Sequence, residues 1–338
     1  MKLYAGIDLH SSNNYLGIID EEDKRIYRQK LSNDLREVLS ALEPFKEEIE
    51  GVVVESTFNW YWLVDGLMED GYRAHLANPS AIKQYEGLKH VDDVHESFFL
   101  ARLLRLGILP EGYIYPKEER PVRDLLRKRL QLVRHRTSHI LSIQNIITRN
   151  TGKRIGGNDI KKVDEEWVSD LFKEEHLLLS INSSVGVIRC LTDKIKRIEK
   201  VVKGEVKLRK EFKGLLTVPG VGDILALTIM LEVGDMGRFK EVGNYSSYCR
   251  CVRSIRISNE KKKGEGNRKN GNKYLSWAYV EAANAAIRSY PRINRYYQRK
   301  KAKTNGIVAV KAISNKLARA SYYIMRDQVA YVAKKLFN

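Results

Sequence analysis

Two short apolar runs near the N-terminus each end in a single acidic residue, and this pattern limits the folds that the chain can adopt. The first run, residues 3–7, leads to Asp8, and the second, residues 51–54, leads to Glu55. Short apolar runs bounded by polar residues are typical of buried strands. A lone acid after one strand is most often a turn or cap residue. Two more acids on a predicted helix favour a different interpretation.

Residues 92–107 predict a helix that carries these two acids. Asp93 and Glu96 are three positions apart, so they share one face of the helix. The same helix has an apolar side, formed by Phe99, Leu100, Leu103, Leu104 and Leu106. Carboxylates that crowd one site repel one another, and a fold tolerates them mainly when divalent cations neutralise their charge.

Asp8, Glu55, Asp93 and Glu96 together predict a two-metal site for phosphoryl transfer. Hard oxygen ligands suit Mg²⁺ or Mn²⁺, and two such ions ~4 Å apart activate an attacking oxygen and stabilise a leaving oxygen on a phosphodiester. The predicted order of elements is strand, hairpin, helix, strand, helix, strand and acidic helix. This order is similar to the ribonuclease H-like fold, an α/β fold whose mixed sheet gathers such acids at one edge.

The overall charge indicates the kind of partner. The chain has 338 residues, with 60 Lys and Arg against 42 Asp and Glu, so its formal net charge is +18. Such an excess predicts an anionic polymer as partner. We expect no membrane partner, because no apolar run reaches the ~18 residues of a spanning helix and the N-terminus lacks a signal-peptide pattern. Three widely split cysteines argue against a disulfide framework and indicate a reducing cytoplasm.

Residues 122–150 predict one long helix with an apolar stripe and a basic remainder. We assign Arg123, Arg127 and Arg134 to a phosphate backbone, with a solvated face on a scaffold helix as the alternative. Residues 159–212 predict two further helices. The spacing of apolar residues in the second of these is typical of a bundle seam, either at a subunit interface or within an intramolecular hairpin.

A Pro-Gly-Val-Gly turn at residues 219–222 lies between two apolar helical segments and resembles a helix-hairpin-helix element. Its Gly220 and Gly222 would present backbone amides to a phosphate, and a plain tight turn is the alternative. Residues 261–273 are too rich in Gly, Asn and Lys to pack a core and predict a mobile basic loop. We assign nucleic-acid contacts there to Lys261, Lys262, Lys263 and Lys273.

Over nearly its full length the chain resembles the insertion-sequence transposases that join a RuvC-like acidic domain to a C-terminal serine-bearing domain. This group is described as bridge-RNA-guided recombinases and is related to pilin-gene inverting enzymes. The family's acids fall on Asp8 in GIDLHS, on Glu55 in VVVEST, and on Asp93 and Glu96 in DDVHES. Glu96 stands where the family usually has Asp, so this ligand is longer by one methylene, and Asp92 is the neighbouring alternative.

The C-terminal likeness rests on GNKYLSWAYVEAA at residues 271–283 and on the Pro-Gly-Val-Gly turn. Counting back by the family spacing puts the nucleophilic serine at Ser258. The Gly and Pro expected upstream fall on Arg250 and Arg253, so Ser254 is a second candidate.

The resemblance implies a mechanism, partners and a domain division. Ser258 would attack a DNA phosphodiester to form a covalent phosphoserine, while Mg²⁺ held by the four acids offsets the charge on the phosphate. Double-stranded DNA would be the substrate, an element-encoded RNA would guide it, and the active site would be shared within a homodimer or homotetramer. We predict a RuvC-like domain at residues 1–110, long basic helices at 111–212 and a mainly helical serine domain at 213–338.

Two other classes of protein fit the same residues. A metal-dependent nuclease or junction resolvase would use the four carboxylates with water as the nucleophile. A non-enzymatic nucleic-acid binder would need the basic helices but not the acids.

Overall fold

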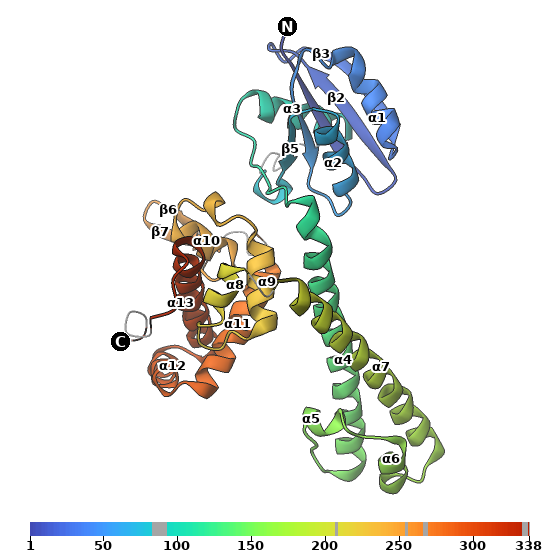
Figure 1. The fold of residues 1–338 in the computed structure, drawn as a ribbon, viewed down its shortest axis with the longest axis vertical. Helices are drawn as coiled ribbons and strands as arrows, with labels where there is room; N and C mark the ends of the chain where they lie inside the picture. Colours follow the sequence, from blue (N-terminus) through green and yellow to red (C-terminus); the bar gives the residue numbers. More distant parts are fainter. Residues whose placement is uncertain (83–92, 207–208, 254–255, 266–269, 333–336, 338) are drawn as a thin grey trace. The chain divides into compact units, whose positions relative to one another are not determined.

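The computed structural model describes residues 1–82, 93–206, 209–253, 256–265, 270–332 and 337. The chain divides into two compact units, Met1–Lys117 and Glu118–Asn338, and each is considered by itself (Figure 1). The three-part division at residues 110 and 212 stays a prediction.

The first unit is built on a five-stranded mixed sheet with the order β3-β2-β1-β4-β5. Its strands are β1 (Leu3–Leu9), β2 (Asn13–Ile19), β3 (Arg25–Ser32), β4 (Ile49–Glu55) and β5 (Ala74–Ala77). The first three strands form an antiparallel meander, whereas β1, β4 and β5 run parallel. This topology, followed by the acidic helix, confirms the predicted ribonuclease H-like α/β fold.

Helices cover both faces of this sheet. Helices α1 (Leu35–Leu42) and α2 (Tyr61–Glu69) pack on one face, and α3 (Asp93–Arg105) packs on the other (Figure 1). Helix α1 ends at Leu42, because Pro44 lies in the 3₁₀ turn Glu43–Phe45 that follows it. A further 3₁₀ turn, Pro79–Ala81, follows β5.

Two glycines allow α3 to lie directly against the sheet. A Cβ at Gly6 in β1 would stand 2.0 Å from the backbone oxygen of Ser97, and one at Gly17 in β2 would stand 2.7 Å from the Ser97 hydroxyl. Only a residue without a side chain leaves room for the helix backbone at these positions. The close approach fixes the height of α3, and hence of its acids, above β1.

The second unit begins with an antiparallel pair of long helices. They are α4 (Arg120–Thr151) and α7 (Glu175–Val206), with the short helices α5 (Gly157–Ile160) and α6 (Glu165–Leu171) between them; the 3₁₀ turn Lys117–Glu119 precedes α4. Buried isoleucines and valines from both long helices pack together at the far end of the pair. Apolar residues of α7 thus pack against α4 of the same chain, as the predicted intramolecular hairpin requires.

The remaining helices form a separate core in the same unit. They are α8 (Lys210–Leu215), α9 (Asp223–Val233), α10 (Val242–Tyr248), α11 (Lys273–Ser289), α12 (Pro291–Lys303) and α13 (Gly306–Asp327), with a 3₁₀ turn at Met236–Arg238. Three fully buried tyrosines, Tyr245, Tyr279 and Tyr322, lie at its centre, and the hydroxyls of the first two are 2.6 Å apart.

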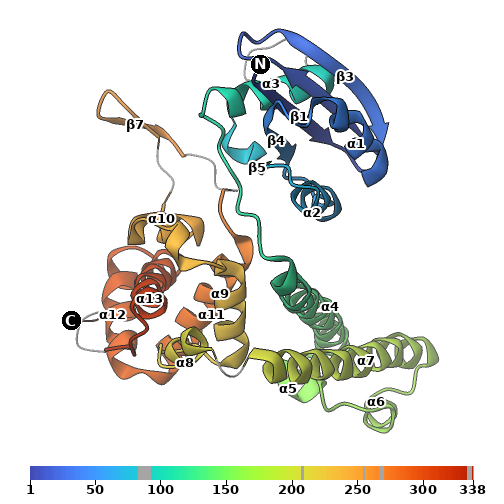
Figure 2. The same ribbon diagram turned by 45° about the horizontal axis from the view of Figure 1, so that its top comes forward.

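The predicted mobile loop at residues 261–273 is wrong in its first part. Residues Lys261–Gly264 form strand β7, which pairs with β6 (Arg256–Ser258) as an antiparallel hairpin (Figure 2). The turn residues Asn259 and Glu260 have φ values of 50° and 58°. Two consecutive left-handed residues are the geometry of a two-residue hairpin turn, and Asn tolerates it well.

None of the helices in the described part of the chain is both long and apolar enough to cross a membrane.

Candidate active site

The register of the sheet brings Asp8 and Glu55 together. Ile7 of β1 pairs with Val54 of β4 in a parallel ladder, so the two acids that follow these residues lie side by side. Side chains alternate along a strand, and Ile7 and Val54 face α1 and α2. Asp8 and Glu55 therefore both face α3.

Helix α3 supplies the third acid. Oxygen atoms of Asp8, Glu55 and Glu96 all lie within 4.8 Å of one another. Asp8 is buried, with 2% of its surface exposed, while Glu55 and Glu96 are half-buried. Asp93 is the first residue of α3, but its side chain lies outside the described part of the structure, as does the whole of Asp92.

The electrostatics of the cluster show the cost of bringing these acids together. The pKa of Glu55 is raised to about 7, first because burial disfavours its charged form and then because of the hydrogen bond and the charge of Asp8. The charge of Glu96 acts in the same direction, and His10 opposes it. Three carboxylate oxygens at this spacing are a donor set of the kind that Mg²⁺ and Mn²⁺ prefer, and a divalent cation would relieve the repulsion.

His10 is a residue of this site that the sequence interpretation missed. Its Nε2 lies 2.9 Å from Oδ2 of Asp8. Its backbone oxygen accepts hydrogen bonds from the side-chain amides of Asn33 and Asn59, both at 3.0 Å. The end of β1 is therefore held from two sides. The signal was present in the sequence, since His10 follows Asp8 by two positions and so shares its face of the strand.

Ser258 lies in a very different setting. It is the last residue of β6, and its side chain is exposed, as are those of Asn259, Glu260 and Lys261. The rival Ser254 lies outside the described residues. Ser258 belongs to the second unit and the acid cluster to the first.

The residues on either side of the hairpin that carries Ser258 are held by hydrogen bonds and close packing. Arg250, with φ of 53°, donates from Nε to the backbone oxygens of Asn270 at 3.1 Å and Gly271 at 2.9 Å. Gly271 has φ of 87°, and a Cβ there would stand 2.4 Å from the backbone oxygen of Tyr248. Asn272 then caps α11 by accepting from the amides of Tyr274 and Leu275.

The three arginines assigned to a phosphate backbone on α4 differ in their surroundings. Arg123 is buried, with 3% exposed, and is thus withdrawn from the surface. Arg127 makes a bidentate pair with the buried Glu232 of α9, at 2.6 and 2.7 Å. Arg134 is exposed. Arg123 and Arg127 therefore have the surroundings expected of a scaffold helix. Of the three arginines, only Arg134 is exposed as a phosphate contact would require.

The Pro-Gly-Val-Gly turn is also partly explained by packing. Gly220, with φ of 79°, faces the backbone of α11, where a Cβ would stand 2.1 Å from the oxygen of Ala282. Gly222 is exposed, caps α9 and would have open space around a Cβ. Asp223 follows in the first turn and pairs with Lys203 at 2.8 Å, so this helix N-terminus already carries a carboxylate of its own.

The predicted basic contacts near the serine are exposed where they are described. Lys261 and Lys263 are exposed on β7, and Lys273 is exposed in the first turn of α11. The side chain of Lys262 is outside the described part of the structure.

Two family models match the chain, and both describe transposases. Residues 5–150 match the DEDD-type transposase model of IS110 elements, and residues 213–298 match the model described as "Transposase IS116/IS110/IS902 family". The "Transposase for insertion sequence element IS1111A" of Coxiella burnetii is 24% identical over 300 residues, which cover 84% of this chain and 77% of that protein. A Pseudomonas aeruginosa protein named "Probable family 20 transposase" is 22% identical over 342 residues, covering 96% of this chain and 97% of the relative.

Proposed function

We propose that this insertion-sequence transposase of the IS116/IS110/IS902 family cuts and rejoins DNA through a bond to Ser258, assisted by the carboxylates of Asp8, Glu55 and Glu96. The observation that carries the proposal is the convergence of these three carboxylates, from two strands and a helix, within 4.8 Å. Asp93 joins them in the proposal on its helical spacing from Glu96 and on the family resemblance.

Asp8, Glu55 and Glu96 would hold Mg²⁺ or Mn²⁺, which when bound supplies positive charge against the phosphate and polarises its oxygens. The protein's own part is to hold the ligands in place. His10 orients the Asp8 carboxylate through Oδ2, and burial of Asp8 keeps water from competing for it. These features favour phosphoryl transfer over a purely structural role for the acids.

The covalent step conserves the number of phosphoester bonds. The Oγ–P bond of Ser258 forms as the P–O bond to a deoxyribose oxygen breaks, the serine proton passes to solvent, and the freed sugar oxygen takes up a proton. Rejoining reverses these changes, with a sugar hydroxyl of the new strand as nucleophile, and restores the serine. No external energy source is needed. Guidance by an element-encoded RNA and a shared site in a homodimer or homotetramer are part of the same proposal, on the family resemblance.

One alternative has an observation in its favour. The acid cluster is assembled within the first unit without any atom of Ser258, as a metal-dependent nuclease or junction resolvase with water as nucleophile would require.

A denaturing gel separates the two functions. The protein is mixed with DNA spanning the ends of its own element, the flanking noncoding transcript and Mg²⁺. We expect a DNA–protein adduct with the wild type and with Ser254→Ala, and none with Ser258→Ala. Cut DNA without any adduct would instead support the nuclease. An adduct that persists in Ser258→Ala but not in Ser254→Ala would identify Ser254 as the nucleophile.

Asp8→Asn tests the acid cluster by a change of one charge. Strand cleavage should fall by about 10³-fold or more, because several kcal/mol of transition-state stabilisation depend on this ligand set and each 1.4 kcal/mol is a factor of ten. Mn²⁺ binding, measured by calorimetry, should weaken in parallel, while DNA binding in the absence of divalent ions stays within about twofold of wild type.

Asp20→Asn is the matched control. Asp20 is another buried acid of this unit, with 8% exposed, and its Oδ1 accepts from the amides of Glu22 and Lys24 at 2.9 Å. Asn keeps an oxygen for these bonds, so cleavage and Mn²⁺ binding should stay near wild type. If both variants lose folding or activity equally, Asp8 is structural.

A further inference from the structure

Helix α12 is strongly basic for its length. Its 13 residues, Pro291–Lys303, include six basic side chains and no acid, and only Ile293 is fully buried. The six are Arg292, Arg295, Arg299, Lys300, Lys301 and Lys303. Like charges three and four positions apart on a helix destabilise it, so a cluster of this size indicates an anionic ligand.

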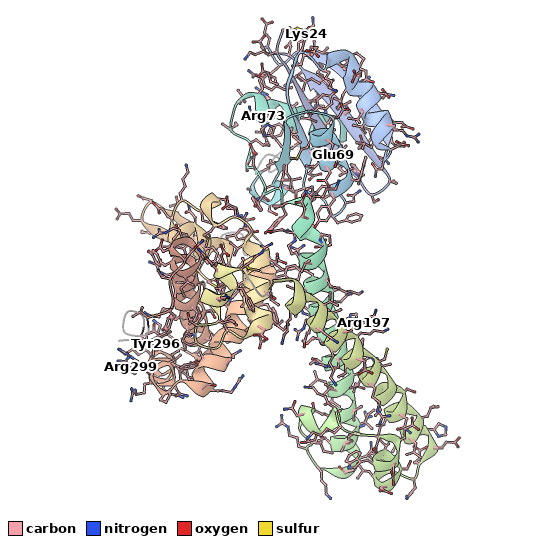
Figure 3. The ribbon with its side chains drawn as sticks, in the orientation of Figure 1. Lys24, Glu69, Arg73, Arg197, Tyr296 and Arg299 are labelled. Atoms are coloured by element: carbon pink, nitrogen blue, oxygen red, sulfur yellow. The ribbon has the colours of Figure 1, made fainter. Side chains whose placement is uncertain are left out.

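The three arginines of this set share one face. Positions 292, 295 and 299 are three and four residues apart, so their side chains lie along about 10 Å of one side of the helix. All three are exposed, and Arg299 projects outward from α12 beside Tyr296 (Figure 3). They line a cleft of about 490 Å³ together with Asn294, Gln298 and Phe337. Among the residues that the structure describes, the lining therefore combines three guanidinium groups with two amides and no carboxylate.

The walls of this cleft are held by contacts of their own. The Nε of Arg292 donates to the backbone oxygen of Phe337, and the Asn294 amide donates to the oxygen of Ile287 at 3.0 Å. Lys316 of α13 lies over the rings of Tyr296 and Phe337, at 5.3 and 5.6 Å from their centroids. The charged face thus rests on a packed floor, which reduces the ordering needed when a ligand binds.

We propose that the α12 cleft binds the phosphodiester backbone of a nucleic acid, with Arg295 and Arg299 each contacting a phosphate. A planar guanidinium matches the two oxygens of a phosphate, and arginines spread along one helix face suit a repeating anion better than a single small one. The contact would carry affinity without reading sequence. This inference rests on the proposed function only for the class of partner, since neither the acids nor Ser258 take part.

The double variant Arg295→Gln/Arg299→Gln tests the cleft through the salt dependence of binding. Fluorescence anisotropy is recorded without divalent ions at several KCl concentrations, with a duplex DNA in one arm and a single-stranded RNA of the same length in the other. We expect the slope of log K against log[KCl] for duplex DNA to become shallower by about 1.8, because each lost phosphate contact removes ~0.9. For RNA the corresponding loss is about 1.4, at ~0.7 for each contact.

Lys161→Gln/Lys162→Gln is the control, because it removes two exposed charges at the end of α5. Its slopes should change by well under 1. A loss in the DNA arm alone, or in the RNA arm alone, supports the proposal and identifies the ligand. Unchanged slopes in both arms, in a variant whose melting temperature matches the wild type, would overturn it. The assay needs no strand cleavage, so it can succeed or fail independently of the serine adduct.

Discussion

The acid cluster and the serine hairpin are built in opposite ways. The acids lie on a central sheet, and their positions follow from strand register and from a helix pressed against two glycines. Ser258 lies on a two-stranded hairpin with exposed residues at its turn, and bracing is found at its base, at Arg250 and Gly271. This contrast suits the proposed function, in which ion ligands are fixed to within a fraction of an ångström and a nucleophile must reach its target.

The difference also concerns how each region responds to change. Strand and helix positions in the first unit are set by many buried contacts, so a substitution there lowers the stability of the unit and also distorts the site. A projecting hairpin opens at low cost without unfolding the helices beneath it. Three substitutions probe this contrast, each at a residue that sets the geometry.

Gly6→Ala should have the largest effect on stability. Its Cβ would stand 2.0 Å from the backbone oxygen of Ser97 and 2.8 Å from the amide of Ala101, so α3 must shift away from the sheet. We expect a loss of about 2–3 kcal/mol in the free energy of opening of β1, measured by amide hydrogen exchange, and weaker Mn²⁺ binding as Glu96 moves with the helix.

Gly186→Ala in α7 is the matched control, because no atom lies within 4 Å of its added Cβ. It should stabilise its helix by about 0.5–1 kcal/mol and leave Mn²⁺ binding unchanged. Equal effects of the two substitutions would show that close packing of α3 does not set the acid cluster.

Arg250→Ala should loosen the serine hairpin alone. It removes one charged N–H that is shared between two backbone oxygens. A hydrogen bond from a charged donor contributes roughly 1.5–3 kcal/mol, and Arg250 is partly exposed, so we expect the lower end. Trypsin cleavage after Lys261 or Lys263 should become about tenfold faster, which corresponds to ~1.4 kcal/mol. Arg253→Ala removes an exposed neighbour whose ion pair with Glu265 is long, at 3.8 Å, so it should change the rate little. An unchanged cleavage rate in Arg250→Ala would mean that contacts other than those of Arg250 hold the hairpin.

Glu55→Gln should give the smallest effect, seen in the pH dependence of melting without divalent ions. The folded state holds the Glu55 proton up to a pKa of about 7, while the unfolded chain releases it near the ordinary value of 4.5. Stability is therefore full below about pH 4.5 and is lost as the pH rises through 7. The variant should match wild type at pH 4 and melt a few degrees higher at pH 8. Exposed Glu22→Gln should follow wild type throughout, and parallel curves for all three would contradict the shift.

Much of the first unit could be predicted because its signals are local. Apolar runs fix the strands, and alternation along them decides which face an acid occupies, so Asp8 and Glu55 could be assigned from the amino-acid pattern alone. Glu96 was predicted from helical spacing. His10 was missed although it obeys the same alternation, because a lone histidine after a strand has many ordinary roles.

The second unit could be predicted less well because its partners are distant in sequence. No pattern in the sequence around Arg127 indicates that it pairs with Glu232, which lies more than a hundred positions later. The role of Gly220 likewise depends on the backbone of α11, and the β6–β7 hairpin depends on a turn whose Asn-Glu pair resembles an ordinary polar loop. Basic composition predicted the partner but not which basic residues are available to it.

Glu232 connects helix α4 to the residue that caps α11. This one buried carboxylate accepts hydrogen bonds from Arg127 of α4 and, at 2.7 Å, from the side chain of Asn272, the residue that closes the serine-bearing segment. Helix α4 has 32 residues and is thus about 48 Å long. Because one carboxylate holds both Arg127 and Asn272, a displacement of α4 at Arg127 is passed on to the base of the segment that carries Ser258.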